Sequence, residues 1–303
     1  MGLAPIALFC YNRLDLLRQT VDALGANKPA VSSNLFIFSD GPKNQDDIAA
    51  VNAIREYIRT ISGFRSVTIR EAETNQGLAN SIIAGVTEVV NKYGRIIVLE
   101  DDIVTAPYFL QWMNDALNLY ENEEKVAGIH AWSPPEQFGK RPETYFIREV
   151  GCWGWATWKK GWALFEQDSQ KLYDEIIDRK LKKEFDRGGA FPYTKMLKDQ
   201  TEGKIDSWAI RWYASAFLAE KYTLQSNVML VENIGFGKGA THCNSNTQKY
   251  KIILSEEKVV WGDNAENENA NLQKEYMYFL RLNRIDFFTR CILKLKKILQ
   301  QII

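Results

Sequence analysis

The 303-residue sequence carries no excess charge, because its 38 basic residues balance its 38 acidic ones. A protein without a global basic field is not expected to take nucleic acid as its partner. Apolar runs are short, and none approaches the roughly 20 residues that a membrane-spanning helix requires. The N-terminus also lacks the basic and apolar regions of a signal peptide, so we expect the chain to fold in the cytoplasm.

Cysteine and histidine are scarce, with four and two residues. The cysteines lie far apart without a CxxC pair or zinc spacing, so we interpret them as reduced thiols. No GxGxxG motif follows the first predicted strand, which argues against a dinucleotide-dependent oxidoreductase. The length fits one large α/β domain, or one domain with a sizeable extension.

Strand and helix patterns alternate over the first hundred residues. Apolar runs predict strands, and apolar residues at helical spacing predict helices. The strands are expected at 5–11, 35–38, 67–70 and 95–99, and the helices at 14–24, 46–61 and 77–92. This order predicts an α/β fold with a mostly parallel sheet flanked by helices. The second half is less regular: we expect helices at 107–120, 172–187 and 206–220, strands at 126–129 and 145–148, and a glycine-rich loop at 232–246.

Polar residues follow three of the predicted strands, where ligands bind in sheets of this kind. They are Arg13, Asp40 and the triplet Glu100-Asp101-Asp102. Three adjacent carboxylates repel one another, and a divalent cation relieves that repulsion. Oxygen ligands suit Mg²⁺ or Mn²⁺, which also bind phosphate oxygens. The triplet therefore predicts a metal site, with a solvated acidic loop as the alternative.

Other candidate site residues have ordinary structural alternatives. Asn75 and Gly77 precede the third helix, where they either bind an anionic ligand or cap the helix. Trp153, flanked by Cys152 and Gly154, is a candidate for stacking on a sugar ring. We interpret His130 as structural and His242, among glycines, as functional. Three further tryptophans are expected in the core: Trp155, Trp158 and Trp212.

The order CYNR, FSDGP, NQGLANSI and VLEDD resembles the donor half of GT-A-fold glycosyltransferases. The resemblance is closest to the N-acetylglucosaminyltransferase I type and to bacterial relatives in surface-polysaccharide synthesis. It continues in GCWGWATW, KIDSWAIRW and GFGKGATHC, and covers roughly residues 4–245. It implies a Rossmann-like GT-A domain over 1–250, with a nucleotide-sugar half at 1–104 and an acceptor half at 105–250. Residues 251–303 would form a C-terminal extension.

The resemblance also implies roles for matching residues. Asp102 would be the direct protein ligand of Mn²⁺ (or Mg²⁺), and His242 would lie near the diphosphate or the metal. Glu100 and Asp101 would contact the nucleotide or metal-bound water, and Arg13 and Asp40 would hold the uracil side of the donor. Asp206 would be the catalytic base, which takes a proton from the attacking hydroxyl. The structural alternative for Asp206 is an N-cap of the following helix.

These roles predict an inverting, metal-dependent transfer of a sugar from a nucleotide sugar, most simply a UDP-sugar. The acceptor would be a hydroxyl of a growing surface glycan of the lipopolysaccharide O-antigen or capsule type. One alternative is a metal-dependent phosphodiesterase or phosphatase, although such enzymes usually carry their acids after the first strand. Another is a non-catalytic glycan-binding relative, against which the intact triplet, Asp206 and His242 argue.

The C-terminal segment 281–303 has a character of its own, with six basic residues and one acidic residue. Apolar residues fall on one helical stripe, and Arg290, Lys294 and Lys297 fall on the opposite one. This pattern is typical of an amphipathic helix on an anionic membrane surface, here the inner face of the plasma membrane. A helix docked on the chain's own body, or on a second copy in a homo-oligomer, is the alternative. The stripe consists of Phe288, Ile292, Leu295, Leu299 and Ile302.

Overall fold

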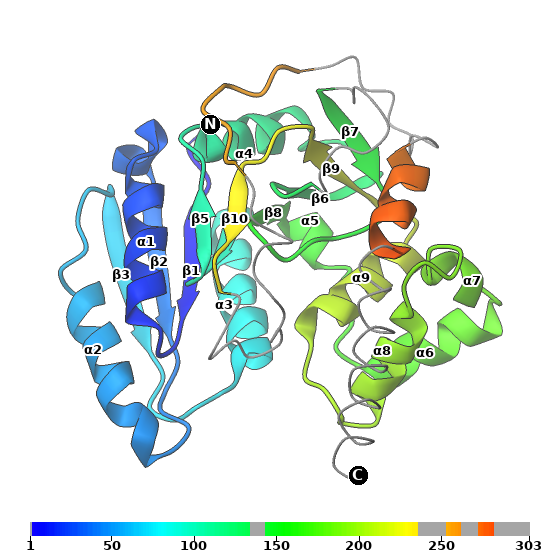
Figure 1. Ribbon diagram of the computed structural model, residues 1–303, viewed down its shortest axis with the longest axis horizontal. Coiled ribbons are helices and arrows are strands. Elements are labelled where there is room, and N and C mark those ends of the chain that lie inside the picture. The colour runs from blue at the N-terminus through cyan, green and yellow to red at the C-terminus, as the bar shows by residue number, and fades with distance from the viewer. Residues whose placement is uncertain (1, 134–142, 236–252, 262–271, 282–303) are drawn as a thin grey trace, which may run out of the picture.

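A central eight-stranded sheet organises the computed structural model, which describes residues 2–133, 143–235, 253–261 and 272–281 (Figure 1). In spatial order its strands are β3 (Ser66–Glu71), β2 (Asn34–Ser39), β1 (Ile6–Cys10), β4 (Arg95–Glu100), β8 (Trp155–Trp158), β6 (Val126–His130), β9 (Tyr222–Ser226) and β7 (Thr144–Ile147). The first four are parallel to one another. β8 runs antiparallel to both β4 and β6, while β9 pairs parallel with β6 and antiparallel with β7. The predicted mostly parallel α/β sheet is confirmed.

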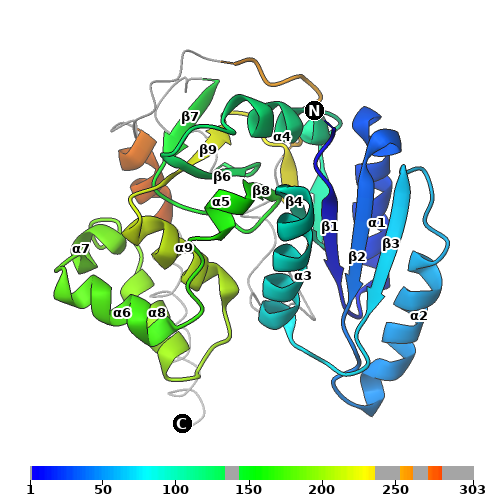
Figure 2. The ribbon, with the colours of Figure 1, turned by 180° about the vertical axis from the view of Figure 1, so that it is seen from behind.

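Helices cover both faces of the sheet, as the two opposite views in Figures 1 and 2 show. One face packs against α1 (Leu14–Gly25), α2 (Ile48–Ile58) and α4 (Phe109–Leu119). The other packs against α3 (Leu78–Tyr93), α5 (Lys159–Trp162) and α9 (Trp208–Leu218). On the far side of α9, a third apolar cluster holds α6 (Ser169–Asp178), α7 (Lys182–Phe185) and α8 (Tyr193–Thr201). Two 3-10 helices, η1 (Lys28–Ser32) and η2 (Gln45–Asp47), lie in the connections of the first half.

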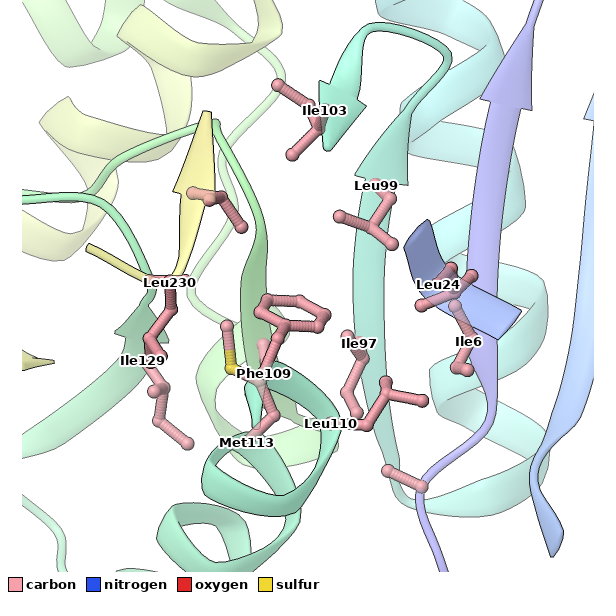
Figure 3. Close-up of a cluster of buried hydrophobic side chains, with 14 of the residues drawn as sticks. Ile6, Leu24, Ile97, Leu99, Ile103, Phe109, Leu110, Met113, Ile129 and Leu230 are labelled. Atoms are coloured by element: carbon pink, nitrogen blue, oxygen red, sulfur yellow. The ribbon is translucent and has the colours of Figure 1, made fainter. Parts of the chain in front are cut away.

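The largest apolar cluster lies between the sheet and the helices α1 and α4 (Figure 3). Ile6 and Ile97 from neighbouring strands meet Leu24 of α1 and Leu110 of α4, and all four are fully buried. Burying each such side chain contributes about 1.5–3 kcal/mol to folding. The apolar residues of α1 recur at helical spacing because one face of the helix packs into this core.

Several elements differ from the predictions. The predicted helix at 172–187 is interrupted, because Lys180 adopts a positive φ of 59° between α6 and α7. Glu232 lies in strand β10 (Val231–Asn233), not in a loop, and pairs with β5 (Ile103–Thr105). The predictions also lacked α8, β8 and β9. β8 has the sequence WATW and is buried along its whole length, so it shows no alternation of polar and apolar residues that would reveal a strand.

The C-terminal extension packs against the body of the protein in both of its described segments. Trp261 stacks on Trp112 of α4, with ring centroids 6.5 Å apart. A helix at 272–281 brings Phe279 to within 5.5 Å of the Trp132 ring centroid. The predicted amphipathic helix at 281–303 lies outside the described residues except for Arg281.

A buried polar cluster attaches the helix at 272–281 to the α6–α8 region. The hydroxyl of Tyr276 donates a hydrogen bond of 2.6 Å to the Glu149 carboxylate, and the Tyr193 hydroxyl donates to the same oxygen. Arg187 Nε lies 3.6 Å from the other oxygen of Glu149. Burial raises the pKa of both tyrosines, so their hydroxyls stay protonated and keep donating. A buried carboxylate with charge-assisted partners fixes the place of this helix.

Among the described helices, none combines the length and the apolar character needed to cross a bilayer.

His130, the last residue of β6, makes the free energy of unfolding depend on pH. Burial lowers its pKa to about 3, although the Trp153 backbone offsets part of this effect. The folded protein therefore holds a neutral ring, while the unfolded chain takes up a proton below the ordinary value of 6.5. Because the unfolded state then binds more protons, stability falls as the pH falls from 6.5 towards 3.

We expect His130→Gln to flatten this dependence. Between about pH 7 and about pH 5.5, the wild-type chain should lose about 1.3 kcal/mol more unfolding free energy than the variant. Urea denaturation at the two pH values measures the difference. Equal losses in the two proteins would show that His130 is not the responsible group.

Candidate functional site

The acidic triplet lies at the carboxyl end of β4, between β1 and β8. Glu100 is half-buried, while Asp101 and Asp102 are 2% and 7% exposed. Burial, together with the charges of Asp102 and Asp101, raises the pKa of Glu100 to about 8. Burial also raises the pKa of Asp101 to about 6, although Arg13 opposes this shift. The end of β4 therefore concentrates more negative charge than its protein surroundings compensate.

Arg13, which immediately precedes α1, is the cation placed against this charge. Its Nη2 forms ion pairs with the Asp101 carboxylate and, at 2.9 Å, with Asp102 Oδ2. The Tyr11 N–H and the Thr20 hydroxyl further fix Asp101, by donating to its carboxylate and its carbonyl. The predicted donor-binding residue thus braces two members of the triplet, and its side chain stays one-quarter exposed.

Asp102 has one oxygen that could accept a metal ion. Its Oδ1 is buried without a hydrogen-bond partner among the described residues, whereas Oδ2 faces Arg13. The described part of the chain contains no group of three or more His, Cys, Asp or Glu residues arranged around a metal position. An ion that takes one or two protein carboxylates and completes its shell with phosphate and water needs no such group. The residues present therefore fit a divalent cation that is shared with a diphosphate.

A late segment of the chain returns to the triplet. β10 pairs with β5, and the N–H of Ile234 donates a hydrogen bond of 2.9 Å to the Asp102 carbonyl. At Gly235, a Cβ would lie 2.0 Å from Asp102 Oδ2, so only glycine fits without a shift. Gly235 is the first residue of GFGKGATHC, so this motif begins against the triplet. His242, in the same motif, lies outside the described residues.

Asp40 organises the loop before α3. One of its oxygens accepts from the N–H groups of Gly41 and Gln76, and the other from the Asn75 amide and the Gly77 N–H, at 2.8–3.0 Å. Gly77, with a φ of +78°, is the N-cap of α3. Asp40 and Asn75 therefore shape one loop, which ends at Gly77 beside Asp206.

Asp40 follows β2 and the triplet lies at the end of β4, the two strands that flank β1 in the sheet. The register pairs Cys10 of β1 with Ser39 on one side, and Phe9 with Glu100 on the other. A pocket of about 250 Å³ opens beside Asp40 and is lined in part by Phe38, Gln76 and Glu88. The predicted meeting of these polar residues at one edge of the sheet follows from this register.

Asp206 is not the N-cap of α9, contrary to the structural alternative drawn from the sequence. Ser207 occupies that position, and its Oγ accepts a hydrogen bond of 3.3 Å from the Ile210 N–H. Asp206 is exposed, and its Oδ2 would lie 3.8 Å from a Cβ at Gly77. One oxygen of the exposed Asp206 carboxylate thus lies near the loop that Asp40 holds.

Trp153 lies beside the same edge of the sheet. The antiparallel register pairs Val98 with Trp155, which places Trp153 towards the triplet end of β4. The half-buried Trp153 ring meets Trp132 edge-on, with centroids 5.3 Å apart. The three tryptophans assigned to the core are each at most 3% exposed, which confirms that prediction: Trp155, Trp158 and Trp212.

Two residues of this site escaped the sequence analysis, namely Thr20 and Gly235. Thr20 stands in the helical pattern of α1 with no sign that its hydroxyl reaches the Asp101 carbonyl. Gly235 did carry a signal, because it opens a glycine-rich motif, but only the fold shows which side chain it approaches.

A comparison with known protein families identifies the family of the chain. Residues 1–183, more than half of the chain, match the GNT-I family. The chain therefore belongs to the GNT-I family, and it is a glycosyltransferase. No curated protein sequence matches it.

Two solved structures show a weaker likeness. TarS of S. aureus is 12% identical, with a TM-score of 0.40 over 75% of this chain, which spans only 36% of TarS. The mannosyltransferase PcManGT of Pyrobaculum calidifontis, solved with GDP-Man and Mn²⁺, is 11% identical, with a TM-score of 0.35 over 72% of this chain and 75% of that one. At such scores the assignment rests on the family match.

The close approach of Gly235 to Asp102 can be tested by adding one methyl group. We expect Gly235→Ala to displace the Asp102 carboxylate and to lower the rate of sugar transfer by about 100-fold, because small displacements of reacting groups are costly. Gly25→Ala is the matched control, since a Cβ there meets nothing within 4 Å. Transfer rates and thermal midpoints measure both variants, and an unimpaired Gly235→Ala enzyme would contradict the assignment of Asp102 to the site.

Proposed function

We propose that the chain catalyses the inverting, metal-dependent transfer of a sugar from a nucleotide sugar, a UDP-sugar, to a hydroxyl group of a growing surface glycan. The observation that carries the proposal is the pairing of two different carboxylates across the two halves. Asp102 keeps a buried, unpartnered oxygen at the end of β4. Asp206 presents an exposed oxygen to Gly77 from the start of α9.

Asp102 Oδ1 would hold Mn²⁺ or Mg²⁺, with His242 as the second candidate ligand. The bound ion supplies Lewis-acid stabilisation of the leaving diphosphate. Arg13 keeps Asp102 oriented through Oδ2, and it offsets the charge of Asp101, so that the buried Oδ1 keeps its lone pairs for a ligand. Burial, and after it the neighbouring carboxylates, raises the pKa of Glu100 and Asp101, and a cation at this place would stabilise their charged forms.

The donor would lie along the edge formed by β1, β2 and β4. The loop that Asp40 holds carries the N-terminus of α3, whose free N–H groups suit an anionic group. In this proposal Asp40 and Asn75 act by shaping the loop. Gly77 has no side chain, so the donor can approach the backbone of the loop closely. Glu100 and Asp101 would contact the ribose or metal-bound water, and Trp153 would stack on a sugar ring.

Asp206 would act as the general base. Its Oδ2 accepts the proton of the acceptor hydroxyl as that oxygen attacks the anomeric carbon, and the bond to the diphosphate breaks on the opposite face. Since Ser207 caps α9, the Asp206 carboxylate is not engaged in capping the helix. Membership of the GNT-I family speaks against the phosphodiesterase alternative, and no feature of the described residues favours a non-catalytic glycan-binding role.

Two carboxylate variants test the proposal. We expect Asp102→Asn to lower Mn²⁺-dependent transfer by about 100-fold or more, and to abolish the thermal stabilisation that donor and Mn²⁺ produce together. Asp206→Asn should lower kcat by about 100-fold or more while that stabilisation persists. The control is Asp178→Asn, an exposed acid on α6. Normal turnover by either site variant would refute the role assigned to it.

We further propose that residues 282–303 bind an anionic membrane surface and so bring the enzyme to a lipid-linked acceptor. A deletion that tests this role should remove 282–303 and keep the helix at 272–281, because that helix packs on the body of the protein. Deleting 282–303 should abolish co-sedimentation with vesicles that contain phosphatidylglycerol, because the basic charge of the tail is lost. Transfer to a soluble acceptor is the control and should persist. Unchanged vesicle binding would refute the membrane role.

A further inference from the structure

Arg211, the fourth residue of α9, is a buried cation beside an exposed acid. It is 6% exposed, and its Nε donates a hydrogen bond of 3.2 Å to the Ser207 carbonyl. Its Nη2 lies 3.3 Å from Asp206 Oδ1. The backbone of α9 therefore holds the guanidinium from one side, and the guanidinium holds Asp206 on the other.

The charge of Arg211 needs this partner. Burial lowers the pKa of Arg211, and the nearby Asp206 carboxylate opposes that shift. Removing a guanidinium from water costs free energy unless an anion and hydrogen bonds replace the water. Within the described residues, Asp206 is the only acid that forms an ion pair with Arg211. An apolar side chain would fill this position without that desolvation cost, so packing alone does not explain an arginine here.

The two oxygens of Asp206 have different surroundings. Oδ1 faces Arg211, whereas Oδ2 faces Gly77 across the gap between the halves. Ser207 caps α9 by accepting from the Ile210 N–H, so the Asp206 side chain does not take that position. An exposed aspartate without such a partner would exchange among several rotamers. The contact with Arg211 selects a rotamer in which Oδ2 points outwards.

We propose that Arg211 is a positioning residue for the transfer reaction: it fixes the rotamer of Asp206 and thereby presents Oδ2 to the acceptor hydroxyl. The inference rests on the proposed role of Asp206 as the base. Holding a catalytic group in the reactive geometry lowers the activation barrier without changing how tightly the donor binds. Arg211 should therefore affect kcat and leave the donor KM unchanged.

Three substitutions separate this role from simple packing. Arg211→Met removes the charge and the hydrogen bonds, and we expect kcat to fall about 10- to 100-fold with the donor KM within about twofold of wild type. Arg211→Lys keeps the charge and should recover part of the loss. Arg179→Met is the matched control, because Arg179 is an exposed arginine at the C-cap of α6. It forms ion pairs with Glu175 and with Glu220, which follows the end of α9 opposite to Asp206, so kcat should not change. Thermal unfolding identifies any variant that fails to fold, and Arg211→Gln then replaces Arg211→Met.

The decisive measurement is the double variant Asp206→Asn/Arg211→Met. If Arg211 acts through Asp206, the double variant should be no slower than Asp206→Asn alone, within about twofold. The inference is overturned if Arg211→Met slows the Asp206→Asn enzyme as much as it slows wild type, or if it raises KM at constant kcat. A wild-type chain that transfers no sugar, or a fully active Asp206→Asn variant, would instead refute the proposed function and this inference with it.

Discussion

Repulsion between carboxylates at the end of β4 is the constraint on which the site depends. Asp101 and Asp102 lie against each other with little solvent to screen them, and Glu100 adds a third charge. Arg13 offsets this charge through Asp101 and one oxygen of Asp102. The strand can end in three acids because Arg13, which follows the neighbouring strand β1, supplies a guanidinium and a ligand can supply the remaining positive charge. Stability and ligand binding are thus set by the same few atoms.

The two halves of the molecule meet where this charge is held. The ribbon of β5 and β10 carries the chain back to Asp102, and Gly235 lets the backbone approach its carboxylate. On the other side, Gly77 stands opposite Asp206 with no side chain between them. Both approaches depend on glycine, because any Cβ would either collide with a carboxylate or occupy the gap. Asp102 and Asp206 are therefore each approached by backbone at a glycine and not by a long flexible side chain from that direction.

Much of the first half could be predicted from the sequence, because apolar runs such as IALFC and the helical spacing of α1 directly reflect burial. The meeting of Arg13, Asp40 and the triplet at one edge also follows from strand-end positions. The second half was harder: β8 is buried along its whole length, and α6 and α7 are separated by a backbone turn at Lys180 that periodicity does not encode. The roles of Asp40 and Ser207 depend on hydrogen bonds between distant or competing positions. Such bonds depend on three-dimensional proximity, which a pattern in one dimension does not contain.

The docked helix at 272–281 has a consequence for how the polypeptide can be shortened. A chain that stopped near residue 250, where the resemblance to known glycosyltransferases ends, would lose Phe279 and Trp261 and so uncover the faces of Trp132 and Trp112. It would also leave the Glu149 carboxylate without the Tyr276 hydroxyl. A truncation intended to improve solubility would then expose aromatic surface and promote aggregation. The useful boundary for crystallisation is therefore Arg281, the last described residue of that helix.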